Sequence, residues 1–167
     1  PAIYGNFISM KELEHPDCDC RMQNGPFPVF SMNTVLVRFS DVLLWKAEAL
    51  IELDRYDEAL PIINRIRTRA ADSIGMLNNF GIYNVGLYSS FANRDEARRA
   101  LRWERRLELG QEGHRFFDLV RWGIAKETID EYLQIERIRK PYLEAANFVK
   151  GRDEYLPIPQ QQINLSG

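Results

Sequence analysis

The fold is decided by residues 38–71, which read RFSDVLLWKAEALIELDRYDEALPIINRIRTRAA. Apolar residues recur there at intervals of three and four, the spacing that places them on one face of an α-helix. The first run covers residues 39–53 and the second covers residues 55–70, with a break at Asp54. Pro61 lies inside the second run and predicts a late helix start or a slight kink, because proline lacks the amide hydrogen that a helix interior needs. Two helices joined by so short a turn predict a helical hairpin of the tetratricopeptide kind, which needs neighbouring helices to bury its faces.

Further helices are predicted in the second half of the chain. Asn93 and Glu96 occupy the N-cap and N3 positions of a capping box just before a new apolar stripe. The later glycines, prolines and apolar positions set the remaining boundaries, and no alternating apolar run is long enough to predict a sheet. The predicted fold class is therefore all-α, with tetratricopeptide-like hairpins and long irregular loops. The additional helices are expected over residues 94–110, 115–122 and 124–133.

The N-terminal part of the chain has a different character. Proline and glycine interrupt every apolar run within residues 1–33, so no helical period is established. A loop of that length is uncommon in a compact domain. We therefore expect residues 1–37 to be an irregular segment left from a larger domain and residues 38–167 to form a helical domain. We also expect the chain to be a fragment or a processed product of a longer protein.

Composition narrows the function classes. The 167 residues include 22 Lys plus Arg and 24 Asp plus Glu, a formal net charge of -2, which is typical of one soluble globular domain. This balance supplies no basic field, so nucleic acid and anionic membrane surfaces are poor partners. The longest apolar stretch, Phe39 to Leu53, carries four charged residues and is no membrane span.

The cysteines offer little chemistry. Cys18 and Cys20 are one residue apart, and residues so close rarely reach disulfide geometry with each other, so we expect no disulfide scaffold. With His15 they form only a weak zinc signature, since no distant ligand completes the set. We find no phosphate loop, no dinucleotide fingerprint and no nucleophilic triad, and we expect no cofactor and no metal.

A charged stretch, ERRLELGQEGHRFFDLVRWG at residues 104–123, carries the most distinctive chemistry. Glu104 and Glu108 fall on the same helical stripe as apolar residues, so both carboxylates should meet the core and require cationic partners. Arg115, Asp118 and Arg121 recur every three residues and can present guanidinium groups to them. A glycosidase would need one of the two acids held protonated, whereas nearby arginines lower carboxylate pKa values. We therefore interpret these five residues as a structural ion network, and the chain as not an enzyme.

Taken together, these segments resemble the C-terminal part of the SusD/RagB family of outer-membrane nutrient-binding lipoproteins. The resemblance extends from residue 38 to about residue 165 and rests on motifs that occur in the family's order. These are RFSDVLLWKAEA at 38–49, ALPIINRIRTRA at 59–70, ERRLEL at 104–109 with EGHRFFDLVRWG at 112–123, and LPIP at 156–159.

The resemblance implies an all-α fold and exposure at the cell surface of the outer membrane. It implies a non-catalytic role as a lid over a SusC-like TonB-dependent transporter that imports captured oligosaccharides or peptides. Family members are longer, with a signal peptide, a lipid-bearing N-terminal cysteine and earlier helical repeats, none of which this chain contains. Contact with the membrane would therefore be made only through a lipid anchor absent from this chain.

Two functions remain open at this stage. An oligosaccharide ligand would be held by the aromatic loop of residues 72–92, with Tyr83 and Tyr88 stacking on sugar faces and Asn78 and Asn79 bonding to hydroxyls. The alternative is a tetratricopeptide-type protein–protein interaction module, whose groove would bind a peptide through side chains such as those of Asn64, Arg67 and Arg69.

Overall fold

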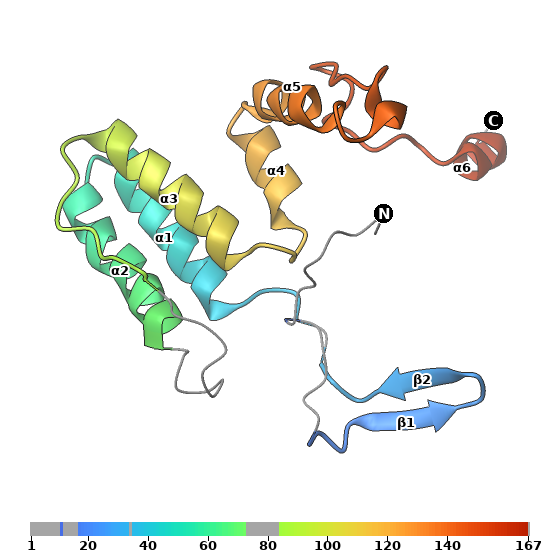
Figure 1. Ribbon diagram of the computed structural model, residues 1–167, viewed down its shortest axis with the longest axis horizontal. Coiled ribbons are helices and arrows are strands. Elements are labelled where there is room, and N and C mark those ends of the chain that lie inside the picture. The colour runs from blue at the N-terminus through green and yellow to red at the C-terminus, as the bar shows by residue number, and fades with distance from the viewer. Residues whose placement is uncertain (1–10, 12–16, 34, 73–83, 167) are drawn as a thin grey trace. The chain divides into compact units, whose positions relative to one another are not determined.

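The computed structural model describes residues 11, 17–33, 35–72 and 84–166. The chain divides into two compact units, residues 1–111 and 112–167. The first unit contains a small hairpin and three helices, and the second contains shorter helices (Figure 1). In order, the elements are β1 (Arg21–Asn24), β2 (Phe27–Phe30), α1 (Phe39–Glu52), α2 (Tyr56–Asp72), α3 (Arg94–Glu108), α4 (His114–Arg121), α5 (Ala125–Glu136), the 3₁₀ helix η2 (Pro141–Leu143) and α6 (Gln160–Ser166).

The core of the first unit lies among α1, α2 and α3. Helix α1 packs against both α2 and α3, which also contact each other, and the three lie side by side in Figure 1. The apolar stripes predicted from the sequence supply this core. Its side chains with no exposed surface are Leu44, Ala47, Ile51, Ala59, Ile63 and Ala97. The α1–α2 pair is thus the expected hairpin, and α3 covers the face that the hairpin cannot bury alone.

The turn between α1 and α2 is held by ionic contacts from α3. Asp54 has a φ of 60°, in the left-handed region that lets the chain reverse direction. Its carboxylate pairs with Arg94, and Glu52 pairs with Arg98. Helix α2 then begins at Tyr56 and continues through Pro61. The late start expected from Pro61 is therefore wrong: the helix continues through the proline, which removes only the one hydrogen bond to the carbonyl of Asp57.

The second unit has a smaller core of its own. Leu119, Ala125 and Phe148 are buried together, and further apolar side chains of α4 and α5 pack around them. Gly123 separates the two helices with a φ of 70°, a conformation that glycine adopts without steric cost. All residues of α6 described by the structure are exposed.

Three features differ from the sequence-based expectations. Residues 21–30 are not irregular: β1 and β2 form an antiparallel hairpin in which Arg21 pairs with Phe30. Its two-residue loop has Gly25 with a φ of 61°, which two-residue hairpin loops favour. Cys18 and Cys20 form a disulfide with each other, contrary to expectation. The C-terminal stretch expected to be loop ends in the short helix α6.

The five predicted helices are present, with ends shifted by a few residues, and the all-α fold class is confirmed. Along the sequence, the boundary between the two units falls between Gln111 and Glu112. The expected boundary between an irregular segment, residues 1–37, and a helical domain, residues 38–167, stays a prediction. No helix among the described residues is long and apolar enough to cross a membrane.

Candidate functional site

Of the four predicted ligand-binding residues, Tyr88 is the one that the structure describes. Tyr83, Asn78 and Asn79 lie outside the described residues. Tyr88 is half-buried, and its ring packs on the core of the first unit, with its centroid 5.4 Å from that of Phe91. The guanidinium of Arg67 lies 4.8 Å from the centre of the same ring. A tyrosine held in this way presents a fixed aromatic surface.

The backbone at Tyr88 is fixed by a side chain of α2. Asn64 donates from Nδ2 to the carbonyl oxygen of Tyr88 over 2.8 Å, and its Oδ1 accepts from the Tyr88 amide over 2.9 Å. Arg67 donates from Nε to the carbonyl oxygen of Gly86 over 2.6 Å. The loop before α3 is thereby pinned to α2 by two side chains that leave one helix face a turn apart.

Tyr88 forms one wall of an open cavity of about 310 Å³ on α3. We call this cavity the α3 groove. The other lining residues come from one face of α3, at intervals of three and four, so that their side chains project together. Trp103 and Arg99 are exposed there, and the guanidinium of Arg106 lies 5.0 Å from the centre of the Trp103 ring. The α3 groove is lined by Tyr88, Glu96, Arg99, Ala100 and Trp103.

Glu96 is ordered by its role at the start of α3. The side chain of Asn93 accepts from the Glu96 amide over 2.9 Å, and Glu96 Oε2 accepts from the Ala92 amide over 2.6 Å. The predicted cap of α3 is therefore present. A carboxylate offers two oxygens and several acceptor positions, so the capping bond leaves Glu96 able to accept a further hydrogen bond from a ligand.

This arrangement suits a polyhydroxylated ligand. Two aromatic side chains provide faces for stacking, while the carboxylate of Glu96 and the guanidinium of Arg99 provide a strong acceptor and strong donors for hydroxyl groups. The small side chain of Ala100 lies between these residues at the bottom of the groove. A volume of about 310 Å³ is near the lower end of ligand sites, which span about 300–1,000 Å³.

The acidic pair of α3 is buried in ion pairs with arginines of the first unit. Glu104 Oε2 accepts from Arg67 over 2.7 Å. Glu108 accepts from Arg38 over 3.0 Å and from Arg69 over 2.6 Å. The two carboxylate side chains are 5% and 6% exposed, too little for a substrate to reach them.

The pKa of Glu104 departs from the sequence-based expectation. Burial raises the pKa of this carboxyl above its ordinary value, although the hydrogen bond and charge of Arg67 oppose that change. The charge of nearby arginines was expected to lower the pKa of Glu104, but the removal of this carboxylate from water raises the pKa by more.

In the second unit, Asp118 is buried and pairs with Arg121 over 2.8 Å. Arg115 lies one turn earlier on α4. The structural ion network predicted for Arg115, Asp118, Arg121, Glu104 and Glu108 would include residues of both units. It stays a prediction.

The metal hypothesis receives no support from the described residues. No group of three or more metal-ligating side chains occurs among residues 11, 17–33, 35–72 and 84–166. His15 lies outside them. Cys18 and Cys20 are joined in a disulfide, so neither sulfur is a thiolate ligand.

Sequence reasoning missed most of the α3 groove. Glu96, Arg99 and Trp103 recur at intervals of three and four within a helix that was predicted correctly. The signal was therefore present as an aromatic and two opposite charges on the exposed face. The loop aromatics and the two acids of the apolar stripe are the stronger signals in the sequence, so the exposed face of α3 was not predicted as a site.

These features define a helical unit with an exposed aromatic groove. A family model described as the SusD family matches residues 29–167, and the chain belongs to this family. Among curated proteins, it is similar to three SusD-like proteins of Formosa agariphila. SusD-like protein P38 is 39% identical over 58% of this chain, P25 is 28% identical over 96%, and P2 is 31% identical over 80%. The matched parts make up 18%, 27% and 24% of the lengths of these relatives, so the chain corresponds to about a quarter of such a protein or less.

Proposed function

We propose that the protein is a non-catalytic, nutrient-binding component of a SusC/SusD-type uptake complex and that its nutrient is an oligosaccharide. It works at the surface of the outer membrane, held by a lipid anchor outside this chain. Its partner is a SusC-like TonB-dependent transporter, which receives the captured ligand. Membership of the SusD family supports this general role.

The observation that carries the oligosaccharide assignment is the α3 groove. Trp103 and Tyr88 offer two aromatic faces beside Arg99 and Glu96. Sugar rings have apolar C–H faces that pack on aromatic rings and hydroxyl edges that bond to charged groups. The groove is open to solvent, which suits a chain-like ligand that enters and leaves readily. Tyr88 retains its predicted role, while Tyr83, Asn78 and Asn79 remain further candidates in the adjoining loop.

The buried acids support a binding role without hydrolysis. Glycosidases place two carboxyl groups on either side of the scissile bond, where the substrate must touch both. Glu104 and Glu108 are covered and bound to arginines. The raised pKa of Glu104 meets one requirement of a general acid, but its burial denies it a substrate.

The peptide-binding alternative is less well supported by the same contacts. Its three candidate side chains already serve the fold: Asn64 binds the backbone of Tyr88, Arg67 binds Glu104, and Arg69 binds Glu108. A peptide would have to displace these bonds before it gained its own. No such cost arises for a sugar in the α3 groove.

Binding to a glycan array by the protein expressed from its complete coding sequence tests the proposal, followed by calorimetric titration of the glycan that binds. Trp103→Ala should weaken the affinity at least about tenfold, since one well-placed aromatic side chain commonly carries that much. Trp45→Ala is the matched control, because Trp45 is a partly exposed tryptophan of α1 outside the groove. Equal loss in both variants, or in neither, would contradict the assignment of the groove.

The transporter assignment has a separate test. Solubilised outer membranes should yield a TonB-dependent transporter when the tagged protein is purified under mild conditions. Purification of the protein alone, with its glycan affinity intact, would disprove the stable complex and leave the binding role in place.

A further inference from the structure

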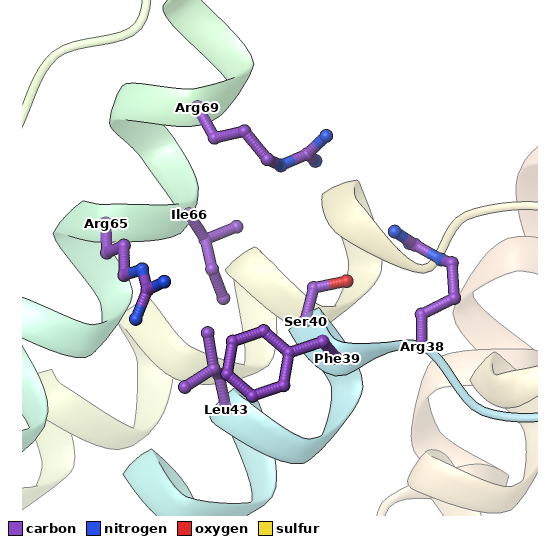
Figure 2. Close-up of a pocket in the computed structure, with 7 residues that line it drawn as sticks. All are labelled: Arg38, Phe39, Ser40, Leu43, Arg65, Ile66 and Arg69. Atoms are coloured by element: carbon purple, nitrogen blue, oxygen red, sulfur yellow. The ribbon is translucent and has the colours of Figure 1, made fainter.

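A second cavity lies between the first turn of α1 and the last half of α2, and its lining is cationic. Its volume is about 360 Å³. Arg38 stands just before α1, and Arg65 and Arg69 leave the same side of α2 one turn apart. Figure 2 shows the three arginines around the apolar side chains of Leu43 and Ile66. We call it the arginine pocket, and its lining is completed by Phe39 and Ser40.

Among the described residues, one arginine of the arginine pocket is not paired with a carboxylate. Arg38 and Arg69 share one carboxylate, that of Glu108. The guanidinium of Arg65 lies 5.6 Å from the centre of the Phe39 ring. Within the part of the chain that the structure describes, no carboxylate forms an ion pair with Arg65. The positive charge of Arg65 thus has no carboxylate partner among the described residues.

Ser40 adds a polar atom that lacks a bonding partner. Its Oγ is buried and has no hydrogen-bond partner among the described residues. Figure 2 shows this hydroxyl directed toward the space between Arg38 and Arg69. A buried hydroxyl without a partner costs free energy, and a ligand atom placed beside it would remove that cost.

We propose that the arginine pocket binds the oxyanion of an acidic ligand, a carboxylate or a sulfate ester carried on a compact ring. Arg65 and the donors of Arg69 that Glu108 does not occupy meet the oxyanion, because each guanidinium carries five N–H donors and the bonds of Arg69 to Glu108 use only some of them. The Ser40 hydroxyl bonds to the same group. The side chains of Phe39, Leu43 and Ile66 accept the apolar face of the ring.

The arginine pocket shares no lining residue with the α3 groove. The inference therefore goes beyond the proposed function and stands even if the groove binds no sugar. A neutral oligosaccharide brings no negative charge to these arginines, whereas a sugar acid or a sulfated sugar does.

Calorimetric titration at constant ionic strength tests the pocket, using the protein expressed from its complete coding sequence. The probes are glucuronate, glucose 6-sulfate and glucose, which present a carboxylate, a sulfate and no charge on similar rings. At least one of the two anions should saturate a single site while glucose does not. The anion that binds more tightly identifies the source of the oxyanion.

Two arginine variants locate the binding. Arg65→Gln should weaken the affinity for the anion about tenfold, the loss expected for one charge-assisted hydrogen bond. Arg139→Gln removes the same charge from an exposed arginine outside the pocket and should leave the affinity unchanged. Trp103→Ala should also leave it unchanged, which separates this site from the groove.

Three results would overturn the proposal. Anions that bind no better than glucose would show that the pocket is closed or filled by another polypeptide segment. Equal weakening in Arg65→Gln and Arg139→Gln would show attraction by overall charge alone. Unchanged affinity in Arg65→Gln would place the bound anion elsewhere.

Discussion

Replacing Arg105 with methionine should destabilise the first unit strongly. Arg105 lies near the end of α3, and its Nη1 donates to Asp41 Oδ1 of α1 over 2.8 Å. The two side chains are 2% and 0% exposed, which makes this a fully buried ion pair between the two helices. Methionine keeps much of the length of arginine but removes the charge and every donor.

The expected size of the effect follows from this burial. Removing one partner of a buried pair typically costs about 3–5 kcal/mol, because the remaining charge stays in a place of low polarity. Arg105→Met should therefore lower the free energy of unfolding by about that amount. The double variant Asp41→Asn with Arg105→Met should cost clearly less than the sum of the two single changes, since it leaves no charge behind.

Urea unfolding followed by circular dichroism measures these differences. Arg98→Met is the matched control, since Arg98 also joins α3 to α1, through Glu52, but at an exposed position. Exposed ion pairs contribute little, so this variant should change stability far less. If Arg105→Met and Arg98→Met unfold at the same urea concentration, burial does not govern the strength of these pairs and the reasoning fails.

Three further changes test other parts of the structure. Because the pKa of Glu104 is raised in the folded protein, the stability that this carboxyl contributes is complete below its ordinary pKa of 4.5 and is lost as the pH rises through the folded-state pKa. Between acid and neutral pH, the wild type should therefore lose stability relative to Glu104→Gln. Urea titrations at several pH values measure this difference. Asn93→Ala removes the cap of α3 and should cost about 1 kcal/mol, read from the same unfolding curves; no change would show the cap to be unimportant. Gly113→Ala should lower the free energy of unfolding by about 1–2 kcal/mol because the φ of residue 113 is 80°, although a methyl group there would meet no other atom. Hydrogen exchange that leaves the amides of α4 as protected as before would refute this.

Elements with a strong helical period were predictable from the sequence. Helices α1, α2 and α3 each bury a stripe, so the positions of Leu44, Ile63 and Leu101 already indicate the face that meets the core. The cap at Asn93 was predictable for a similar reason, because a capping box is local in sequence. Local signals of this kind need no knowledge of the partner helix.

Elements without a buried face were not predictable in this way. Both strands of the hairpin expose apolar side chains, among them Met22, Phe27 and Phe30, so no alternation between apolar and polar residues marked them. Helix α6 is exposed along its described length and gave no stripe either.

The site was harder to predict than the fold, because its contacts join distant parts of the chain. The need of Glu104 and Glu108 for arginines was evident from their stripe. Their partners in the first unit were not, since Arg67 and Arg69 are 37 and 39 residues away along the chain. Helix packing brings these residues together, and a pattern within one helix carries no information about it.

The central claim, that the α3 groove holds an oligosaccharide, is tested most directly by the indole N–H signals of the 167-residue chain in a ¹H–¹⁵N spectrum. The chain contains three tryptophans, at positions 45, 103 and 122, so three signals are expected. On titration with the glycan selected by the array, the signal of Trp103 should shift and saturate while that of Trp45 stays in place. A Trp103 signal that does not move at glycan concentrations that saturate the complete protein would contradict the account.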